Sequence, residues 1–119
     1  MIQFDRLTIK AQEAVLDAQK AAEKHGHQQL EVDHLLLSLV AQKDGMTLPL
    51  LKQLGADPGV LQKELEKTLE DKPRVSGGGA GQLYLSPELN RVMDQAQDEA
   101  DRLKDDFISV EHLLLGILA

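Results

Sequence analysis

Apolar residues recur every three or four positions along most of this chain, which is the period of an amphipathic helix. No stretch alternates apolar and polar residues with a period of two, so we predict no β-strands. Residues that favour helix starts and helix ends divide the pattern into six predicted helices. These helices span residues 8–25, 32–43, 48–54, 57–71, 86–104 and 109–119.

The boundaries of these helices rest on a few specific residues. Thr8, Ser86 and Ser109 each offer a side-chain oxygen to the free N–H groups of a first helical turn, and Asp57 does the same before a proline. Gly26 follows the first predicted helix, where a glycine can enter the left-handed region without strain. The pattern therefore predicts an all-α protein.

A shift of 78 residues lays the chain over itself without a gap. Segment 32–37 (Val-Asp-His-Leu-Leu-Leu) then falls on segment 110–115 (Val-Glu-His-Leu-Leu-Leu), and Leu7-Thr8 falls on Leu85-Ser86. The predicted buried stripe repeats as well, which indicates duplication of one helical unit. In the second copy the stripe consists of Leu89, Val92, Met93, Ala96, Ala100 and Leu103, and in the first of Ala11, Ala14, Val15, Ala18, Ala22 and His25.

These observations predict one domain over residues 1–119, with pseudo-twofold symmetry. Repeat one covers 1–73, a glycine-rich linker covers 74–84, and repeat two covers 85–119. Counterparts of residues 42–72 would lie beyond Ala119, so the second repeat is incomplete. We therefore expect further helices there, because burial of an apolar side chain stabilises by roughly 1.5–3 kcal/mol. The residues expected to lack partners are Leu113, Leu114, Ile117 and Leu118.

The composition excludes several kinds of protein. Twenty acidic residues against 13 basic ones give a formal net charge of −7, which opposes binding to nucleic acid or to an anionic membrane. The same charge is compatible with partners that present Lys and Arg, although solubility alone would also explain it. The chain has no cysteine, its first six residues lack the basic stretch and apolar run typical of a signal peptide, and no apolar run is long enough to span a bilayer.

No pattern in the sequence predicts catalysis. The glycines at 77–81 are followed by Gln82 and Leu83 where a Walker A motif needs Lys and Ser or Thr. No Ser–His–Asp arrangement can be argued from the spacing either. We therefore predict no catalytic residue and no cofactor in this chain.

The four histidines are expected to be structural. His25 and His27 lie at a predicted helix end, where the helix dipole favours a cation. We favour this interpretation over a metal site. His34 and His112 occupy equivalent positions just inside two helix starts. We expect their ring nitrogens to form hydrogen bonds with loop carbonyls, and we predict no metal ligand among them.

Four segments together resemble the Clp N-terminal domain family, and in particular its ClpB-type disaggregase branch. They are 4–8 (Phe-Asp-Arg-Leu-Thr), 32–37, 72–77 (Lys-Pro-Arg-Val-Ser-Gly) and 107–114 (Phe-Ile-Ser-Val-Glu-His-Leu-Leu). The resemblance implies two four-helix repeats placed ahead of AAA+ ATPase modules in a cytoplasmic homohexamer, with the isolated domain a monomer. ATP and Mg²⁺ are expected only in those modules.

The resemblance further implies a surface that engages unfolded or aggregated proteins, or adaptor proteins. Thr8, Asp105 and Glu111 match the substrate-contact residues of the family, beside an apolar groove. From the helical stripe and the loop before the last helix, we add Leu85, Met93 and Phe107 as groove residues. A polar loop with no binding role would also explain the acids around Phe107.

One motif departs from the related ClpC-type proteins, which recognise phosphorylated arginine. Those relatives carry Gly-Thr-Glu-His in both repeats, whereas this chain has Glu-Val-Asp-His at 31–34 and Ser-Val-Glu-His at 109–112. The threonine hydroxyls are missing, which argues against phosphoarginine binding. An adaptor-docking module is the second hypothesis, and a free-standing enzyme that uses Glu111 or His112 is the third.

Overall fold

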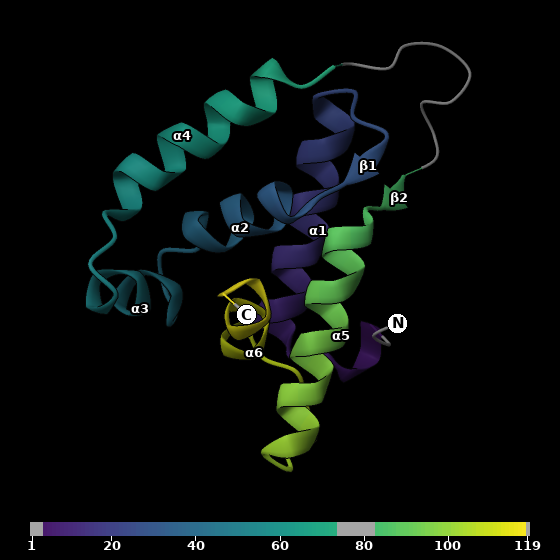
Figure 1. The fold of residues 1–119 in the computed structure, drawn as a ribbon, viewed down its shortest axis with the longest axis vertical. Helices are drawn as coiled ribbons and strands as arrows, with labels where there is room; N and C mark the ends of the chain where they lie inside the picture. The colour runs from purple at the N-terminus through teal and green to yellow at the C-terminus, as the bar shows by residue number, and fades with distance from the viewer. Residues whose placement is uncertain (1–3, 74–82, 119) are drawn as a thin grey trace.

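The computed structural model describes residues 4–73 and 83–118, which form six α-helices, one short 3-10 helix and two short strands. The prediction of an all-α fold is confirmed in its main feature. In chain order the elements are η1 (Phe4–Arg6), α1 (Ile9–Lys24), β1 (Gln29–Leu30), α2 (Val32–Ala41), α3 (Thr47–Gln53), α4 (Pro58–Asp71), β2 (Tyr84–Leu85), α5 (Pro87–Arg102) and α6 (Val110–Leu118) (Figure 1).

The helix boundaries follow the residues that predicted them. Thr8, Asp57 and Ser86 each accept backbone N–H groups of the first helical turn with a side-chain oxygen. Gly26 and Gly55 end α1 and α3 with φ angles of 69° and 84°, values at which a side chain would be strained. Local capping chemistry therefore determines where these helices begin and end.

Three predicted boundaries were wrong by one or two residues. Helix α2 ends at Ala41 because Gln42 already has an extended backbone, whereas the prediction extended it to residue 43. Helix α3 begins at Thr47. Helix α5 ends at Arg102, and Lys104 takes a left-handed conformation with φ of 60°. Leu103 consequently falls outside the helix and is 50% exposed, so its assignment to the buried stripe is wrong.

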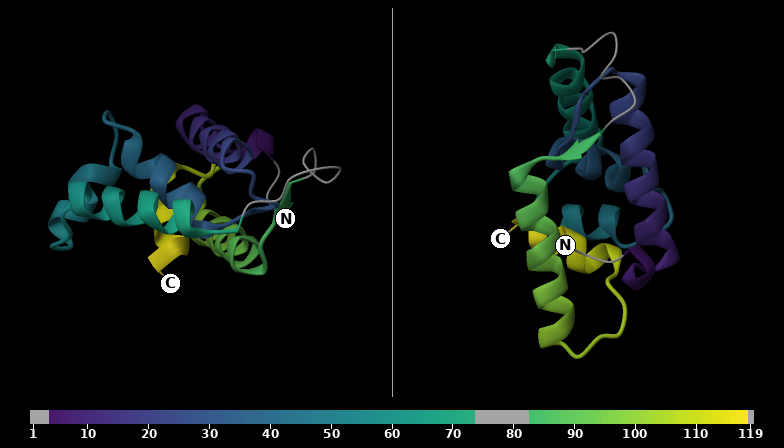
Figure 2. Two further views of the ribbon diagram at one scale, coloured as in Figure 1. Left: turned by 90° about the horizontal axis from the view of Figure 1, so that it is seen from above. Right: turned by 90° about the vertical axis from the view of Figure 1, so that its right-hand side faces the viewer.

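The duplication appears in the elements themselves. Helices α1 and α5 each contain 16 residues and begin 78 positions apart, at Ile9 and Pro87. Helices α2 and α6 also begin 78 positions apart, at Val32 and Val110. In the ribbon diagrams α1 and α5 run in opposite directions, as a twofold relation requires (Figures 1 and 2).

The prediction of no strands was wrong. Strands β1 and β2 pair in parallel, with Leu30 opposite Leu85, and a separate parallel bridge joins Leu7 to Ile108. Strands of two residues are too short to produce a detectable alternation in the sequence. Tyr84, which was assigned to the linker over 74–84, belongs to β2, and the rest of that linker up to residue 82 lies outside the described residues.

These two pairings are symmetry equivalents of each other. The Thr8 N–H donates to the Ile108 carbonyl and the Ser86 N–H donates to the Leu30 carbonyl, each at 3.0 Å. A shift of 78 converts Thr8 into Ser86, and Leu30 into Ile108. The start of each repeat is therefore bonded to the connection that precedes the second helix of the other repeat.

In the core, α1 contributes mainly small side chains, whereas α5 contributes both alanines and the larger Leu89, Val92 and Met93. Four alanines of α1 are completely buried, which lets the helices α1 and α2 pack closely. The largest fully buried apolar side chains come from both repeats, and six of them form one core: Leu30, Leu35, Leu39, Leu89, Ile108 and Leu113. Leu69 of α4 is also fully buried but lies outside this cluster.

The closest helix contact in each repeat uses a small residue at equivalent positions. In repeat one the Ser38 hydroxyl lies 2.8 Å from the Ala14 carbonyl oxygen of α1, to which it donates. In repeat two the counterpart of Ser38 is Gly116, and a Cβ added there would lie 2.6 Å from the Val92 carbonyl oxygen. Helix α6 therefore packs against α5 at a distance that only glycine allows without movement.

Candidate functional site

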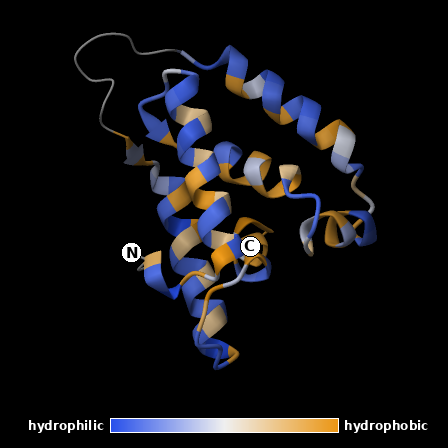
Figure 3. Ribbon diagram, turned by 180° about the vertical axis from the view of Figure 1, so that it is seen from behind, coloured by the Kyte–Doolittle hydropathy of each residue, from blue (hydrophilic) through white to orange (hydrophobic). Residues whose placement is uncertain are grey.

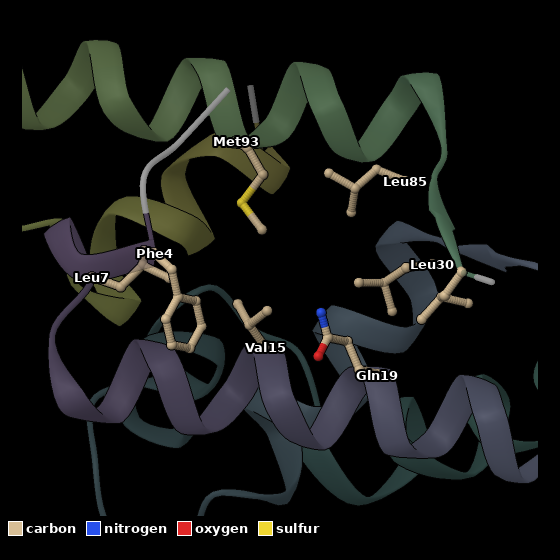
Figure 4. Close-up of a pocket in the computed structure, with 8 residues that line it drawn as sticks. Phe4, Leu7, Val15, Gln19, Leu30, Leu85 and Met93 are labelled. Carbon is tan, nitrogen blue, oxygen red and sulfur yellow. The ribbon is translucent and has the colours of Figure 1, made fainter. Parts of the chain in front are cut away.

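Two of the six predicted site residues, Leu85 and Met93, line a hollow of about 270 Å³ between the two repeats. Figure 4 shows α1 along one side of this hollow and α5 along the other, with Phe4 at one end. The lining is apolar except for the amide of Gln19. The hollow is therefore mainly apolar, and its walls come from both copies of the repeat.

Thr8 and Glu111 line a second hollow, where the start of α1 faces the start of α6. Ile9 and Met46 also line this hollow and are 75% and 49% exposed, respectively. Sequence reasoning did not select either residue. Ile9 could have been noticed because it is an apolar residue of α1 that lies outside the buried stripe.

The edge of this second hollow carries an ion pair. The ammonium nitrogen of Lys10 lies 3.0 Å from both carboxylate oxygens of Asp44. The hydrogen bond from Lys10 lowers the pKa of Asp44 below its usual value, and the same bond raises the pKa of Lys10. Both groups are exposed, so the pair shapes the local charge more than it stabilises the fold.

Asp105, Phe107 and Glu111 line a third hollow beside the loop that joins α5 to α6. Phe107 is 57% exposed, as the sequence suggested. Glu111 lines both the second and the third hollow, so these two form one continuous surface around the start of α6. The structure therefore brings Thr8, Asp105, Phe107 and Glu111 together.

Glu111 forms no ion pair within residues 4–73 and 83–118, whereas its counterpart in repeat one is paired. That counterpart is Asp33, which lies 3.6 Å from the Lys72 ammonium, and Lys72 also reaches Glu31 at 3.0 Å. Burial alone would lower the pKa of Lys72, but its bonds and charge interactions with Glu31 and Asp33 raise it above the usual value. Repeat two therefore presents an acid to solvent at the position where repeat one neutralises one.

A further hollow lies between α6 and the helices α2, α3 and α4, and its lining is almost entirely leucine and isoleucine. Figure 3 shows that α6 is hydrophobic over most of its length. Leu118 is 61% exposed, whereas its counterpart Val40 is 3% exposed. The expectation that Leu113 and Leu114 also lack partners was wrong, because both are buried against the core.

The structural role of His34 and His112 is supported, but the expected hydrogen-bond partners were wrong. The Glu31 N–H donates to Nδ1 of His34 at 2.9 Å, and the Ser109 N–H donates to Nδ1 of His112 at 2.8 Å. The rings therefore accept from the backbone instead of bonding to carbonyls. Nε2 of His34 lies 2.8 Å from Nδ1 of His27, so the two buried imidazoles share a hydrogen bond.

Burial lowers the pKa values of His34 and His27. It lowers the pKa of His34 to about 4, and the nearby ring of His27 contributes to this shift. Burial also lowers the pKa of His27, with a contribution from His25, whose ring stacks on it at 5.4 Å between centroids. Nδ1 of His25 itself lies 2.8 Å from the Ala21 carbonyl, at the end of α1.

The described part of the chain offers neither a metal site nor a membrane-spanning helix. Among residues 4–73 and 83–118, no group of three or more His, Asp or Glu side chains is arranged to hold a metal ion. No helix in the same residues has the length and apolar character needed to cross a bilayer.

Comparison with known proteins agrees with this geometry. A model of the Clp repeat (R) N-terminal domain matches residues 6–119. The chaperone protein ClpB of Nitratidesulfovibrio vulgaris is 41% identical over 115 residues, and that of Bacillus cereus is 38% identical over 115 residues. Each alignment covers 95% of this chain and 13% of the relative. This chain therefore corresponds to a small part of those proteins.

Solved structures share the fold at lower sequence identity. The N-terminal domain of the ClpV1 ATPase from Escherichia coli superposes with a TM-score of 0.83 at 24% identity, covering 96% of this chain and 68% of that one. The fold and the reciprocal pairing define a duplicated helical repeat domain.

The chain belongs to the Clp repeat N-terminal domain family. Domains of this family are non-catalytic, so the chain is a domain without ATPase activity and with no active site of its own.

Proposed function

We propose that this domain binds unfolded or aggregated protein segments for an ATP-dependent disaggregating chaperone. The observation that carries the proposal is the surface around the start of α6, where exposed apolar side chains lie beside exposed acids. Phe107, Ile9 and Met46 supply the apolar contacts, and Asp105 and Glu111 supply the charge.

The chemistry of this surface matches a segment that contains both apolar and basic residues. Folded proteins bury most of their large apolar side chains, whereas an unfolded segment exposes most of them. Asp105 and Glu111 would attract Lys or Arg next to such a residue, and Thr8 offers a polar contact at the rim. The hollow between the repeats, lined by Leu85 and Met93, supplies an additional apolar contact.

Binding of this kind is expected to be weak and tolerant of sequence. An unfolded segment loses conformational freedom when it docks, which offsets part of the interaction energy. A small number of apolar contacts on an open surface is expected to exceed that loss only by a small margin. Weak binding suits a domain that must release its substrate to ATPase modules.

An NMR titration tests the proposal. The probe is an unstructured peptide of Leu, Arg and Ser residues, and a matched peptide with Glu in place of Arg is the control. The Leu–Arg peptide is expected to shift the signals of Thr8, Asp105 and Glu111, and the Leu–Glu peptide to shift them much less. If neither peptide perturbs these residues, the proposed binding surface is wrong.

Docking of a folded adaptor is the second candidate, and one observation favours it. A ClpV N-domain, which shares only the fold with this chain, was solved in complex with a VipB peptide. An adaptor would use a larger and more polar interface than an unfolded segment. Capture of one folded partner, with no response to unfolded peptides, would support the adaptor role instead.

The wider protein is also part of the proposal. We infer that the domain is joined to AAA+ modules that bind ATP and Mg²⁺ and assemble as a homohexamer in the cytoplasm, as the curated relatives' family suggests. The isolated domain is then a monomer. Sedimentation of the isolated domain and sequencing beyond Ala119 test these two statements.

A further inference from the structure

Asp105 lies in the loop between α5 and α6, and His112 holds its side chain. Oδ2 of Asp105 lies 2.9 Å from Nε2 of His112, and the two side chains are 50% and 7% exposed. Within residues 4–73 and 83–118, His112 is the only side chain that forms a hydrogen bond with this carboxylate. The half-exposed carboxylate of Asp105 is therefore held by the buried imidazole of His112.

The hydrogen bonds assign the tautomer of His112. A neutral imidazole has one donor nitrogen and one acceptor nitrogen. The Ser109 N–H donates to Nδ1 at 2.8 Å, so Nδ1 is the acceptor and the ring proton is on Nε2. That proton points at Asp105, and the ring therefore connects a helix start to an exposed acid.

The backbone of the loop is held as well. The Asp105 N–H donates to the Ala100 carbonyl at 2.8 Å. The Arg6 guanidinium donates to the Asp105 carbonyl at 3.3 Å, and it forms an ion pair with Asp101 at 3.1 Å. With the backbone fixed from two sides, the remaining freedom of Asp105 is its side-chain rotation, which is the freedom that His112 restricts.

Repeat one contains the same relay with a different final group. The Glu31 N–H donates to Nδ1 of His34 at 2.9 Å, and Nε2 of His34 lies 2.8 Å from His27. His27 is the counterpart of Asp105, but it is buried, with 8% exposed. The final residue of the relay changes from a buried imidazole to an exposed carboxylate. At the first residue, Ser109 replaces Glu31, and its hydroxyl also lies 3.0 Å from Nδ1 of His112.

We infer that His112 is a positioning residue, which holds the Asp105 carboxylate in one orientation toward the hollow lined by Phe107 and Glu111. This inference rests on the proposed function, because the orientation of Asp105 matters for binding only if that hollow takes a ligand. A side chain that is already ordered loses less freedom on binding. Removal of the support should therefore weaken peptide binding by about 2- to 10-fold.

Two substitutions of His112 separate its two hydrogen bonds. His112→Asn places an amide oxygen near the position of Nδ1, so it keeps the acceptor for Ser109 and loses the donor to Asp105. His112→Gln places an amide N–H₂ near Nε2, so it keeps the donor and loses the acceptor. His34→Asn makes the first change in repeat one and serves as the matched control.

Two measurements are made on all three variants and on the wild type. The first is the χ1 coupling constants of Asp105 in the free domain, and the second is the Kd for the Leu–Arg peptide. We expect His112→Asn to average the Asp105 rotamers and to weaken peptide binding. His112→Gln should keep the rotamer and the affinity closer to those of the wild type. His34→Asn should change neither the Asp105 rotamer nor the affinity.

The rotamer measurement tests the inference whether or not the peptide binds. An unchanged Asp105 rotamer in His112→Asn overturns it. The inference is also overturned if His112→Asn lowers the affinity by the same factor in a domain that already carries Asp105→Ala. In that case His112 would act on binding through a group other than Asp105. A wild-type domain that ignores the peptide refutes the proposed function, and the coupling constants alone then decide the positioning role.

Discussion

Acid should destabilise this domain through His34, whose ring is fully buried. Nδ1 accepts the Glu31 N–H and Nε2 donates to His27, so neither nitrogen can take or lose a proton without breaking a hydrogen bond. The folded-state pKa is about 4, against about 6.5 in an unfolded chain. The stabilisation from the neutral ring is therefore complete above pH 6.5 and is lost as the pH falls toward 4.

The size of this effect follows from the two pKa values. Between pH 7 and pH 5 the unfolded chain takes up a proton at this residue and the folded domain does not. The linkage relation gives a loss of up to about 2 kcal/mol in the free energy of unfolding over that interval. Asp and Glu side chains titrate mainly below pH 5, so they contribute little in this window.

Urea unfolding followed by circular dichroism at pH 7, 6 and 5 measures the loss directly. His34→Asn is the reference, because its amide oxygen can still accept the Glu31 N–H but does not titrate. The variant should be less stable than the wild type at pH 7, and the gap should shrink by about 2 kcal/mol at pH 5. Parallel pH curves for the two proteins would refute the assignment of acid sensitivity to His34.

Three further predictions concern packing, capping and charge. Gly116→Ala should lower the free energy of unfolding by about 1–3 kcal/mol in urea titrations, because the new Cβ would lie 2.6 Å from the Val92 carbonyl oxygen. Gly45→Ala is the control and should be nearly neutral, because a Cβ at Gly45 would have nothing within 4 Å. Ser86→Ala should cost about 1 kcal/mol in the same assay, since it removes the acceptor for the Leu89 N–H at the start of α5, and an unchanged midpoint would contradict that capping role. Affinity for the Leu–Arg peptide should fall as NaCl rises from 50 to 500 mM, and an affinity independent of salt would argue against an acidic rim.

The sequence was sufficient to predict most of the fold, because the determining signals are local. Capping residues such as Thr8 and Asp57 and terminating glycines such as Gly26 act within one helical turn, and each acts in the structure as predicted. The duplication was also visible, since a shift of 78 needs no gap. The reciprocal pairing of Leu30 with Leu85 was not visible, because two-residue strands leave no periodic pattern.

The candidate site was predictable in part. Thr8 is distant in sequence from Asp105, Phe107 and Glu111, which lie in one short segment, and a family resemblance together with one exposed aromatic was enough to select all four. Ile9 and Met46 were missed because exposure of a single apolar residue depends on tertiary packing. The hydrogen bond between His112 and Asp105 also depends on the exact course of the loop after α5, which spacing does not determine.

The reciprocal strand pairing has a consequence for how the two halves hold together. Each half pairs the segment before its first long helix with the segment before the second helix of the other half. Because both pairings use equivalent segments, the contact has the isologous geometry of a twofold dimer. Two separate copies of such a half could satisfy these hydrogen bonds across a symmetry axis. The association of the two halves therefore depends on the hydrogen bonds between them as well as on the peptide chain that joins them.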